Sequence, residues 1–289
     1  MRFRKLLAAT AATAALAPAL LHAAHHETND KPDPVLVEVV NGDWRSAEDK
    51  ARDQYRHPVE SLTFWGLKPG MTILEIQPGS GAWWTRILAP YAARTGGQYF
   101  ATAADLANPE TSEGARKARA AFEKSLSDEK LYGKVGLVDW GSKSIPLAPN
   151  RFDFILTARS VHGWMRNPGM VEKTFAEFYA ALKPGGILAV EQHRANPGPQ
   201  DEKAQSGYVT EAYVIEQAEK AGFKLAARSE INANPRDTKD HPFGVWTLPP
   251  ALRSTAYGSG QDADPNFDHS KYVAIGESDR MTLKFVKPE

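Results

Sequence analysis

The hydrophobic positions of the chain gather into short apolar runs that alternate with longer amphipathic segments. The runs are rich in aliphatic residues and bounded by turn residues, a pattern typical of buried strands. They lie at residues 71–76, 98–104, 135–138, 152–157, 187–191, 223–231 and 281–286. Helical spacing marks the segments 44–66, 82–93, 109–130, 170–182 and 208–221. This alternation predicts an α/β fold in which helices cover both faces of a parallel sheet.

Three segments fall outside the alternation. Residues 25–43 are polar with one apolar run, and we place them before a domain of residues 44–289. Residues 232–280 are rich in Pro, Gly, Asn and Asp, which predicts a long insertion between the last two strands. Residues 1–24 have the pattern of a signal peptide, with a basic start and an uncharged run over residues 6–21.

The alternative for the leader is a membrane anchor. Its uncharged run is shorter than the roughly 20 apolar residues that span a bilayer, so we expect cleavage. The protein is then exported, to the periplasm or beyond, and its mature chain has no membrane span.

The composition excludes several kinds of partner and site. Lys plus Arg and Asp plus Glu each number 35 in 289 residues, so the net charge is zero and we expect no nucleic-acid partner. Hydrophobic residues make up 42%, enough for a sizeable core. The absence of cysteine excludes disulfides, zinc–thiolate sites and thiol nucleophiles. A small molecule is the expected substrate.

The clearest functional pattern is the loop after the first strand. Gly79, Ser80 and Gly81 stand between a strand and a helix, where glycines let a ligand approach the backbone. Asp105 ends the second strand, where a carboxylate accepts hydrogen bonds from ribose hydroxyls. Together they predict a nucleoside-containing ligand. The alternative is an ordinary strand–helix turn with an exposed aspartate.

Two nucleoside cofactors fit such a loop, and the sequence favours S-adenosylmethionine over NAD. A dinucleotide site needs Gly-x-Gly-x-x-Gly, in which the third Gly allows close packing near the pyrophosphate. Here Trp84 stands in that place after Trp83, and we expect the two indoles to crowd a pyrophosphate. S-adenosylmethionine has no phosphates, and Glu75 is placed to hold its amino group.

Several motifs carry a family resemblance. They are residues 74–81, 83–85, 87–91, 159–164, 182–186, 193–195, 221–223 and 234–235, with Asp237 and His241. With them the chain resembles the class I S-adenosylmethionine-dependent methyltransferases, most closely the exported predicted methyltransferases of uncertain substrate, over roughly residues 44–288. The resemblance implies a three-layer, doubly wound, Rossmann-like sheet of seven strands whose last strand is antiparallel.

The resemblance also implies which residues bind the cofactor. Glu75, Gly79 and Gly81, with Ser80 between the glycines, would line its methionine end. Asp105 would take the ribose, and Asp139 and Trp140 would flank the adenine. The chain departs from the broad motif at Gln77 and Pro78, where a Gly is usual, so its loop is stiffer and bulkier.

The reaction centre is expected at the carboxyl ends of the fourth and fifth strands, where ligands of open α/β sheets bind. His162 or His193 suits a general base, because the ordinary pKa of histidine lies near 6.5. Arg159 or Arg194 suits an acidic substrate group. The alternative for each histidine is a hydrogen-bonded structural role, and Trp164 is expected to form a pocket wall.

Two further clusters have simpler explanations. The insertion holds potential metal ligands at Asp262, Asp264, Asp268 and His269, but it lacks the Gly and terminal Glu of a calcium loop, so we expect no metal. Four indoles would suit either an aromatic cage or, as we expect, core packing: Trp44, Trp65, Trp83 and Trp84.

We therefore expect an enzyme, an exported S-adenosylmethionine-dependent methyltransferase that acts on a small molecule. One alternative is a protein of this fold that binds a small ligand without catalysis, which the bulky Gln77–Pro78 pair favours. Another is an enzyme of a different class. The missing third Gly argues against a dehydrogenase, and no Gly-x-Ser-x-Gly elbow supports a serine hydrolase.

Overall fold

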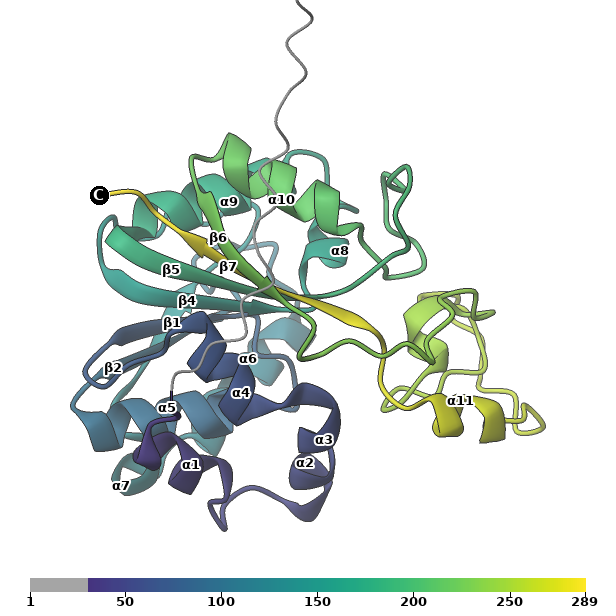
Figure 1. The fold of residues 1–289 in the computed structure, drawn as a ribbon, viewed down its shortest axis with the longest axis horizontal. Coiled ribbons are helices and arrows are strands. Elements are labelled where there is room, and N and C mark those ends of the chain that lie inside the picture. The colour runs from purple at the N-terminus through teal and green to yellow at the C-terminus, as the bar shows by residue number, and fades with distance from the viewer. Residues whose placement is uncertain (1–30) are drawn as a thin grey trace, which may run out of the picture.

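A seven-stranded sheet organises the part of the chain that the computed structural model describes, residues 31–289 (Figure 1). Its strands are β1 (Thr72–Ile76), β2 (Gln98–Ala103), β3 (Val135–Asp139), β4 (Phe152–Ala158), β5 (Leu182–His193), β6 (Lys224–Ser229) and β7 (Arg280–Val286). The sheet order is β3-β2-β1-β4-β5-β7-β6. The first five strands are parallel, and β7 is antiparallel to β5 and β6. The predicted α/β topology is therefore confirmed.

Helices cover both faces of the sheet (Figure 1). One face carries α1 (Pro34–Val40), α4 (Pro58–Trp65), α5 (Thr85–Thr95), α6 (Glu113–Ser125) and α7 (Glu129–Tyr132). The other carries α9 (Met170–Ala181) and α10 (Glu211–Lys220). The short helices are α2 (Ala47–Ala51), α3 (Asp53–Arg56), α8 (Val161–Trp164), α11 (Ser270–Ile275) and the 3-10 turn η1 (Gly244–Thr247).

Local chemistry explains where these helices begin and end. Ser112 caps α6 by accepting the amide of Ala115, and Gly96 ends α5 in a left-handed conformation with φ of +74°. The helix predicted over residues 109–130 is two helices, because α6 stops at Ser125 and Asp128 caps α7. The apolar run in the N-terminal polar segment is α1, which buries Leu36 and Val39 in the core.

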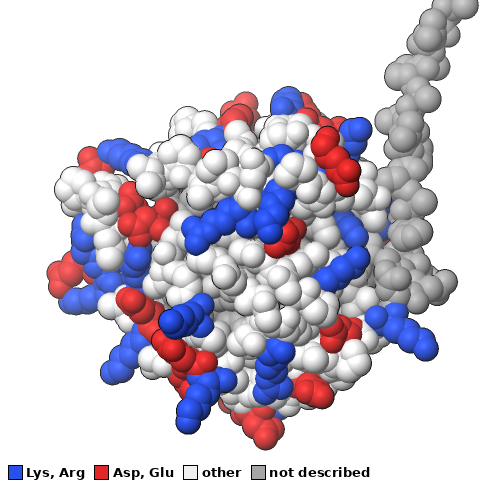
Figure 2. All heavy atoms as spheres, turned by 90° about the vertical axis from the view of Figure 1, so that its left-hand side faces the viewer, with Lys and Arg blue, Asp and Glu red and all other residues white. Residues whose placement is uncertain are grey.

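The predicted insertion, residues 232–280, lies beside the carboxyl ends of the parallel strands, at the right of Figure 1. It carries η1 and α11. At the opposite end of the strands, basic and acidic side chains are interspersed over the described surface (Figure 2). The expected leader lies outside the described residues, and none of the helices within residues 31–289 combines the length and apolarity needed to cross a membrane.

Three of the four tryptophans pack in the core, as expected. Trp65, Trp83 and Trp84 are buried, with Trp65 and Trp84 edge to face at 5.8 Å between ring centroids. The indole N–H of Trp65 donates to the Leu283 carbonyl at 3.0 Å, which fixes α4 to β7. Trp44 is half-buried and donates to the Arg86 carbonyl.

Replacing Trp65 tests this packing. Trp65→Ala should lower the free energy of unfolding by about 3–5 kcal/mol, because it empties a buried site and orphans the Leu283 carbonyl. Urea unfolding measures the loss. The control Val273→Ala, at a side chain that is 53% exposed, should change stability by less than about 0.5 kcal/mol. Equal losses in the two variants would contradict a core role for Trp65.

Candidate cofactor and active site

A cavity of about 320 Å³ lies beside the loop between β1 and α5. This volume falls within the range of small-ligand pockets, roughly 300–1,000 Å³. The loop, the end of β2, the residue after β3 and one side of α6 form its wall. The lining residues are Gln77, Pro78, Gly79, Thr102, Ala103, Ala104, Ala115, Ala118, Arg119, Phe122 and Trp140.

The glycine loop leaves its backbone open to this space. A Cβ added at Gly79 or Gly81 would meet no protein atom within 4 Å, and Gly79 has a φ of +72° that side chains disfavour. Gln77 is held out of the way, because its carboxamide accepts the Trp164 indole N–H at 2.8 Å. The loop therefore allows a ligand to approach the main chain closely.

The expected crowding by two indoles is wrong. Trp83 and Trp84 are 3% and 2% exposed and point into the core rather than into the cavity. The Trp83 N–H donates to the Asp49 carbonyl at 2.9 Å, which ties this turn to α2. The missing third Gly, and not steric crowding by the indoles, is thus what separates this loop from a dinucleotide site.

Glu75 lies beneath the loop, buried and held by two hydroxyls. Its Oε2 accepts from Thr85 at 2.8 Å and from Tyr99 at 2.6 Å. Burial raises the pKa of Glu75 to about 7, although the hydrogen bonds from Tyr99 and Thr85 favour the carboxylate. Glu75 does not itself line the cavity, so its predicted contact with the cofactor stays a prediction.

The expected adenosine-binding residues surround the same cavity. Trp140 lines it, with its N–H donated to Glu177 at 3.0 Å. Asp105 directly follows the lining residue Ala104, and its Oδ1 accepts the amides of Ala107 and Asn108 in a tight turn. Ser80 and Gly81 are exposed on the loop beside the cavity. The cofactor roles of these residues stay predictions.

Arg119 of α6 is a lining residue that sequence reasoning missed. It pairs with Asp139 and donates to the Ala104 carbonyl at 2.7 Å, so it joins the ends of β2 and β3. Its buried Nε has no partner among the described residues. Nothing in the charged segment 109–130 distinguishes this arginine from its neighbours, and only the folded position of α6 does so.

The chemistry of the wall fits an adenosine-containing ligand. The indole of Trp140 and the apolar side chains of Ala115, Ala118 and Phe122 suit a base, while the open glycine loop suits a polar tail. No phosphate is required, since Arg119 is already paired with Asp139. The residues present therefore fit S-adenosylmethionine.

The expected reaction centre is assembled at the ends of β4 and β5. Arg159 follows β4, and its backbone N–H donates to the Glu191 backbone carbonyl at 2.7 Å. His162 of α8 and His193 of β5 have ring centroids 5.6 Å apart. The structure thus brings together three of the four residues predicted for the chemistry. Trp164 packs beneath them against Trp140 and Phe178.

Both histidines are neutral at physiological pH. Burial, together with the charge of Arg166, lowers the pKa of His162 to about 4. Burial likewise holds the pKa of His193 well below its usual range, with His162 and Arg280 adding to the effect. His162, His193 and Arg159 are nevertheless half-buried residues and are not fully enclosed.

Hydrogen bonds assign the tautomer of His162, whereas the contact of His193 is compatible with either tautomer. The Gln192 carboxamide accepts the Val161 N–H and donates to the Gly207 carbonyl, so its amino group must donate to His162 Nδ1, 3.2 Å away. Neutral His162 therefore carries its proton on Nε2. His193 Nδ1 lies 2.6 Å from the Ser278 hydroxyl, and either of the two groups can be the donor.

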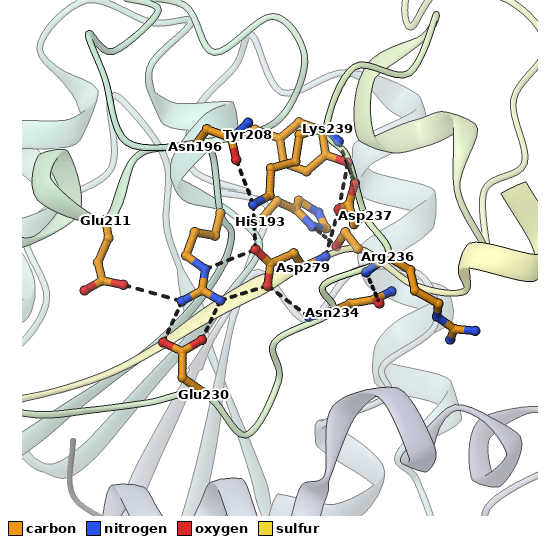
Figure 3. A network of polar contacts seen from close by, with 12 residues as sticks. His193, Asn196, Tyr208, Glu211, Glu230, Asn234, Arg236, Asp237, Lys239 and Asp279 are labelled. Atoms are coloured by element: carbon orange, nitrogen blue, oxygen red, sulfur yellow. Dashed lines mark hydrogen bonds and ion pairs between the residues drawn. The ribbon is translucent and has the colours of Figure 1, made fainter.

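Arg194 belongs to a different network, whose members Glu230, Asp237 and Asp279 lie at the junction of the sheet and the insertion (Figure 3). Its guanidinium binds Glu230 at 2.7 and 2.8 Å and Asp279 at 2.9 and 3.1 Å. Asp237, buried beside it, accepts from Tyr208 at 3.0 Å and binds His241 at 2.8 Å. These contacts anchor the insertion. Of the two arginines predicted to bind an acidic substrate group, Arg159 is the one whose guanidinium forms no ion pair with the described residues.

The fold is that of the class I S-adenosylmethionine-dependent methyltransferases. A family model described as a methyltransferase domain matches residues 74–190, so this part of the chain is a methyltransferase domain. The match runs from β1 through the glycine loop to β5. It includes the cavity-lining loop, Trp140, Arg159 and His162.

Two solved structures with TM-scores above 0.5 share this fold, and a third has a higher sequence identity but a lower TM-score. The [4+2]-cyclase SpnF is 18% identical over 93% of this chain and 88% of its own, with a TM-score of 0.52. A candidate sarcosine dimethylglycine methyltransferase from Galdieria sulphuraria is 13% identical over 87% and 91%, with a TM-score of 0.52. An S-adenosylmethionine-dependent methyltransferase from Aquifex aeolicus is 22% identical over 63% and 87%, with a TM-score of 0.45. No curated protein matches the chain.

The raised pKa of Glu75 predicts a pH-dependent stability. A carboxyl whose folded pKa exceeds its ordinary value of 4.5 stabilises the fold below that value and loses this contribution as pH rises through about 7. Glu75→Gln should therefore gain stability relative to the parent between pH 5 and pH 8, by up to roughly 3 kcal/mol. Urea unfolding at several pH values measures the difference. A difference that does not change with pH would contradict the raised pKa.

Proposed function

We propose that the protein is an exported S-adenosylmethionine-dependent methyltransferase that acts on a small molecule. The open cavity beside Gly79, within the matched methyltransferase domain, carries this proposal. Export rests on the leader pattern of residues 1–24 and implies a periplasmic or secreted enzyme.

In this proposal the two ends of the site have separate tasks. The glycine loop and Trp140 hold the cofactor, and Asp105 takes its ribose. When bound, S-adenosylmethionine supplies the electrophilic methyl group. Arg159, His162 and His193 orient the acceptor, and orientation of this kind is worth about 7–11 kcal/mol in the best systems.

The tautomers separate the roles of the histidines. His162 presents an N–H and suits a hydrogen-bond donor to the acceptor molecule. In this proposal His193 donates from Nδ1 to Ser278, which leaves its Nε2 as the proton acceptor for substrates that must lose a proton. Because its pKa is low, His193 assists only weakly unless a bound anion raises it.

The fold alone does not fix the reaction, as the cyclase neighbour illustrates. The non-catalytic alternative rested on the bulk of Gln77 and Pro78. Both residues line the cavity without filling it, so that objection to cofactor binding loses its force.

Calorimetry of the protein with S-adenosylmethionine and S-adenosylhomocysteine tests the proposal. Gly79→Ala should weaken binding at least tenfold, because a Cβ there enters the space kept for the ligand. Gly96→Ala is the matched control, since Gly96 has the same left-handed backbone and an equally open Cβ position at the other end of α5. Equal effects of the two variants, or no binding by the parent protein, would reject the proposal.

Asp105 provides an independent test of the ribose contact. Asp105→Ala should weaken cofactor binding by about 1–3 kcal/mol, the scale of hydrogen bonds to a charged group. Asp128→Ala removes a comparable side-chain cap on a turn outside the cavity and should leave affinity unchanged. Unchanged affinity in Asp105→Ala would show that this carboxylate does not reach the ligand.

A further inference from the structure

A buried cluster of charged side chains lies next to the predicted reaction centre. It joins α2 and α3, the ends of β4 and β5 and the start of β7. Its members are Arg52, Arg56, Arg159, Glu191, Glu277 and Arg280. The cluster thus contains four guanidinium groups and two carboxylates. Only the fold brings them together, since they are spread over more than two hundred residues of sequence.

Both carboxylates are already engaged. Glu277 binds Arg52 at 2.6 Å and Arg56 at 3.0 Å, and it also contacts Arg280. Glu191 lies 3.1 Å from the Arg280 Nε, an ion pair without hydrogen-bond geometry. The neighbouring Glu75 is bound by Tyr99 and Thr85. Neither oxygen of Glu191 has a hydrogen-bond partner among the described residues, and the charge of Glu191 also acts on Arg159.

Two of the arginines have free donors. The buried Nε of Arg159 has no partner among the described residues, and none of them forms an ion pair with its guanidinium. Both terminal nitrogens of Arg56 are buried and also lack a partner, although its guanidinium stacks on Trp83 at 4.7 Å. Arg159 also has a strained backbone, with a φ of +59°.

Such an excess of buried positive charge is unfavourable without an anion. Burial lowers the pKa of both Arg56 and Arg159, and the nearby arginines contribute to the effect. Arginine keeps its proton in proteins, so Arg159 stays charged, and Glu191 and Glu277 offset the cost of burying that charge only in part. The neutral His162 and His193 add no further charge, but His162 adds an N–H donor.

The members of the cluster differ in exposure, and the Arg52 side chain, which binds Glu277, is 24% exposed. Arg56 and Arg280 are 0% and 1% exposed, whereas Arg159, His162 and His193 keep accessible surface. Trp246 of the insertion lies edge to face with His162 at 5.7 Å and forms a wall beside it. Arg159, beside the two imidazoles, is therefore the accessible arginine of the cluster that has no ion pair among the described residues.

We propose that Arg159 binds an oxyanion of the methyl acceptor, a carboxylate or a phosphate, with His162 Nε2–H as a second donor. This inference rests on the proposed function and names the class of its substrate. A guanidinium pairs with two oxygens of such a group at once, which orients the acceptor. The bound negative charge also strengthens the adjacent His193 as a proton acceptor.

Anion titration of the purified protein tests the proposal. Calorimetry with potassium phosphate and with potassium acetate, against potassium chloride at equal ionic strength, is done first without S-adenosylhomocysteine and then with it at saturation. We expect phosphate or acetate to bind and Arg159→Gln to weaken that binding at least tenfold, with affinity for S-adenosylhomocysteine preserved within about threefold. Phosphate alone would identify a phosphorylated acceptor, and acetate alone a carboxylic one.

Two further variants control for nonspecific effects of replacing an arginine. Arg151→Gln removes an exposed arginine at the opposite end of β4 and should leave anion binding unchanged. Arg159→Lys keeps the charge but loses the planar fork, so its anion binding should be several-fold weaker. Arg159→Lys replaces Arg159→Gln as the test variant if Arg159→Gln does not fold. Imidazole resonances of His162 and His193 should shift on anion binding in the parent protein.

The outcomes separate this inference from the proposed function. If S-adenosylhomocysteine does not bind, the proposed function fails. If it binds but neither anion does, only the acceptor site fails. Loss of anion binding on saturation with S-adenosylhomocysteine would assign Arg159 to the cofactor's own carboxylate and overturn the proposal. Unchanged anion binding in Arg159→Gln would overturn it as well.

Discussion

The carboxylate of Glu277 connects the parts of this protein that the chain separates. Arg52 and Arg56 reach it from the N-terminal helices, and Arg280 reaches it from β7. Burial alone would raise the pKa of Glu277, but these arginines hold that pKa below its usual range. The contact fixes the N-terminal helices and the end of the insertion against the carboxyl ends of β4 and β5, where the predicted site lies. It also consumes one of the two carboxylates that face four guanidinium groups.

Most of the fold was predictable from the sequence because strand and helix periods differ and the turns carry Gly and Pro. All seven strands were located, although β5 begins at Leu182, earlier than its apolar run suggested. The four-residue helix α8 was missed, since Val161–Trp164 is too short for a helical period. The apolar run in the polar N-terminal segment gave no sign that it packs as α1 on the core.

The residues of the candidate site were predictable where the local structure requires a particular residue type. Glycines at a strand–helix turn and polar residues at strand ends are examples. Gly79 and Trp140 line the cavity, and Arg159, His162 and His193 lie together at the ends of β4 and β5. Side-chain partners were not predictable. The pairing of Arg194 with Asp279 and Glu230, and the lack of a partner for Arg159, depend on contacts between distant segments. The direction of the Trp83 and Trp84 indoles depends on packing against α2 and α4.

Fold and reaction remain separate questions for this class of protein, because the same sheet supports methyltransferases and a cyclase. The most direct measurement is a crystal structure of the protein with S-adenosylhomocysteine. Our account predicts the adenosine in the cavity between Trp140 and α6, with the thioether directed toward Arg159 and the two imidazoles. A ligand bound elsewhere, or a thioether directed away from the ends of β4 and β5, would contradict it.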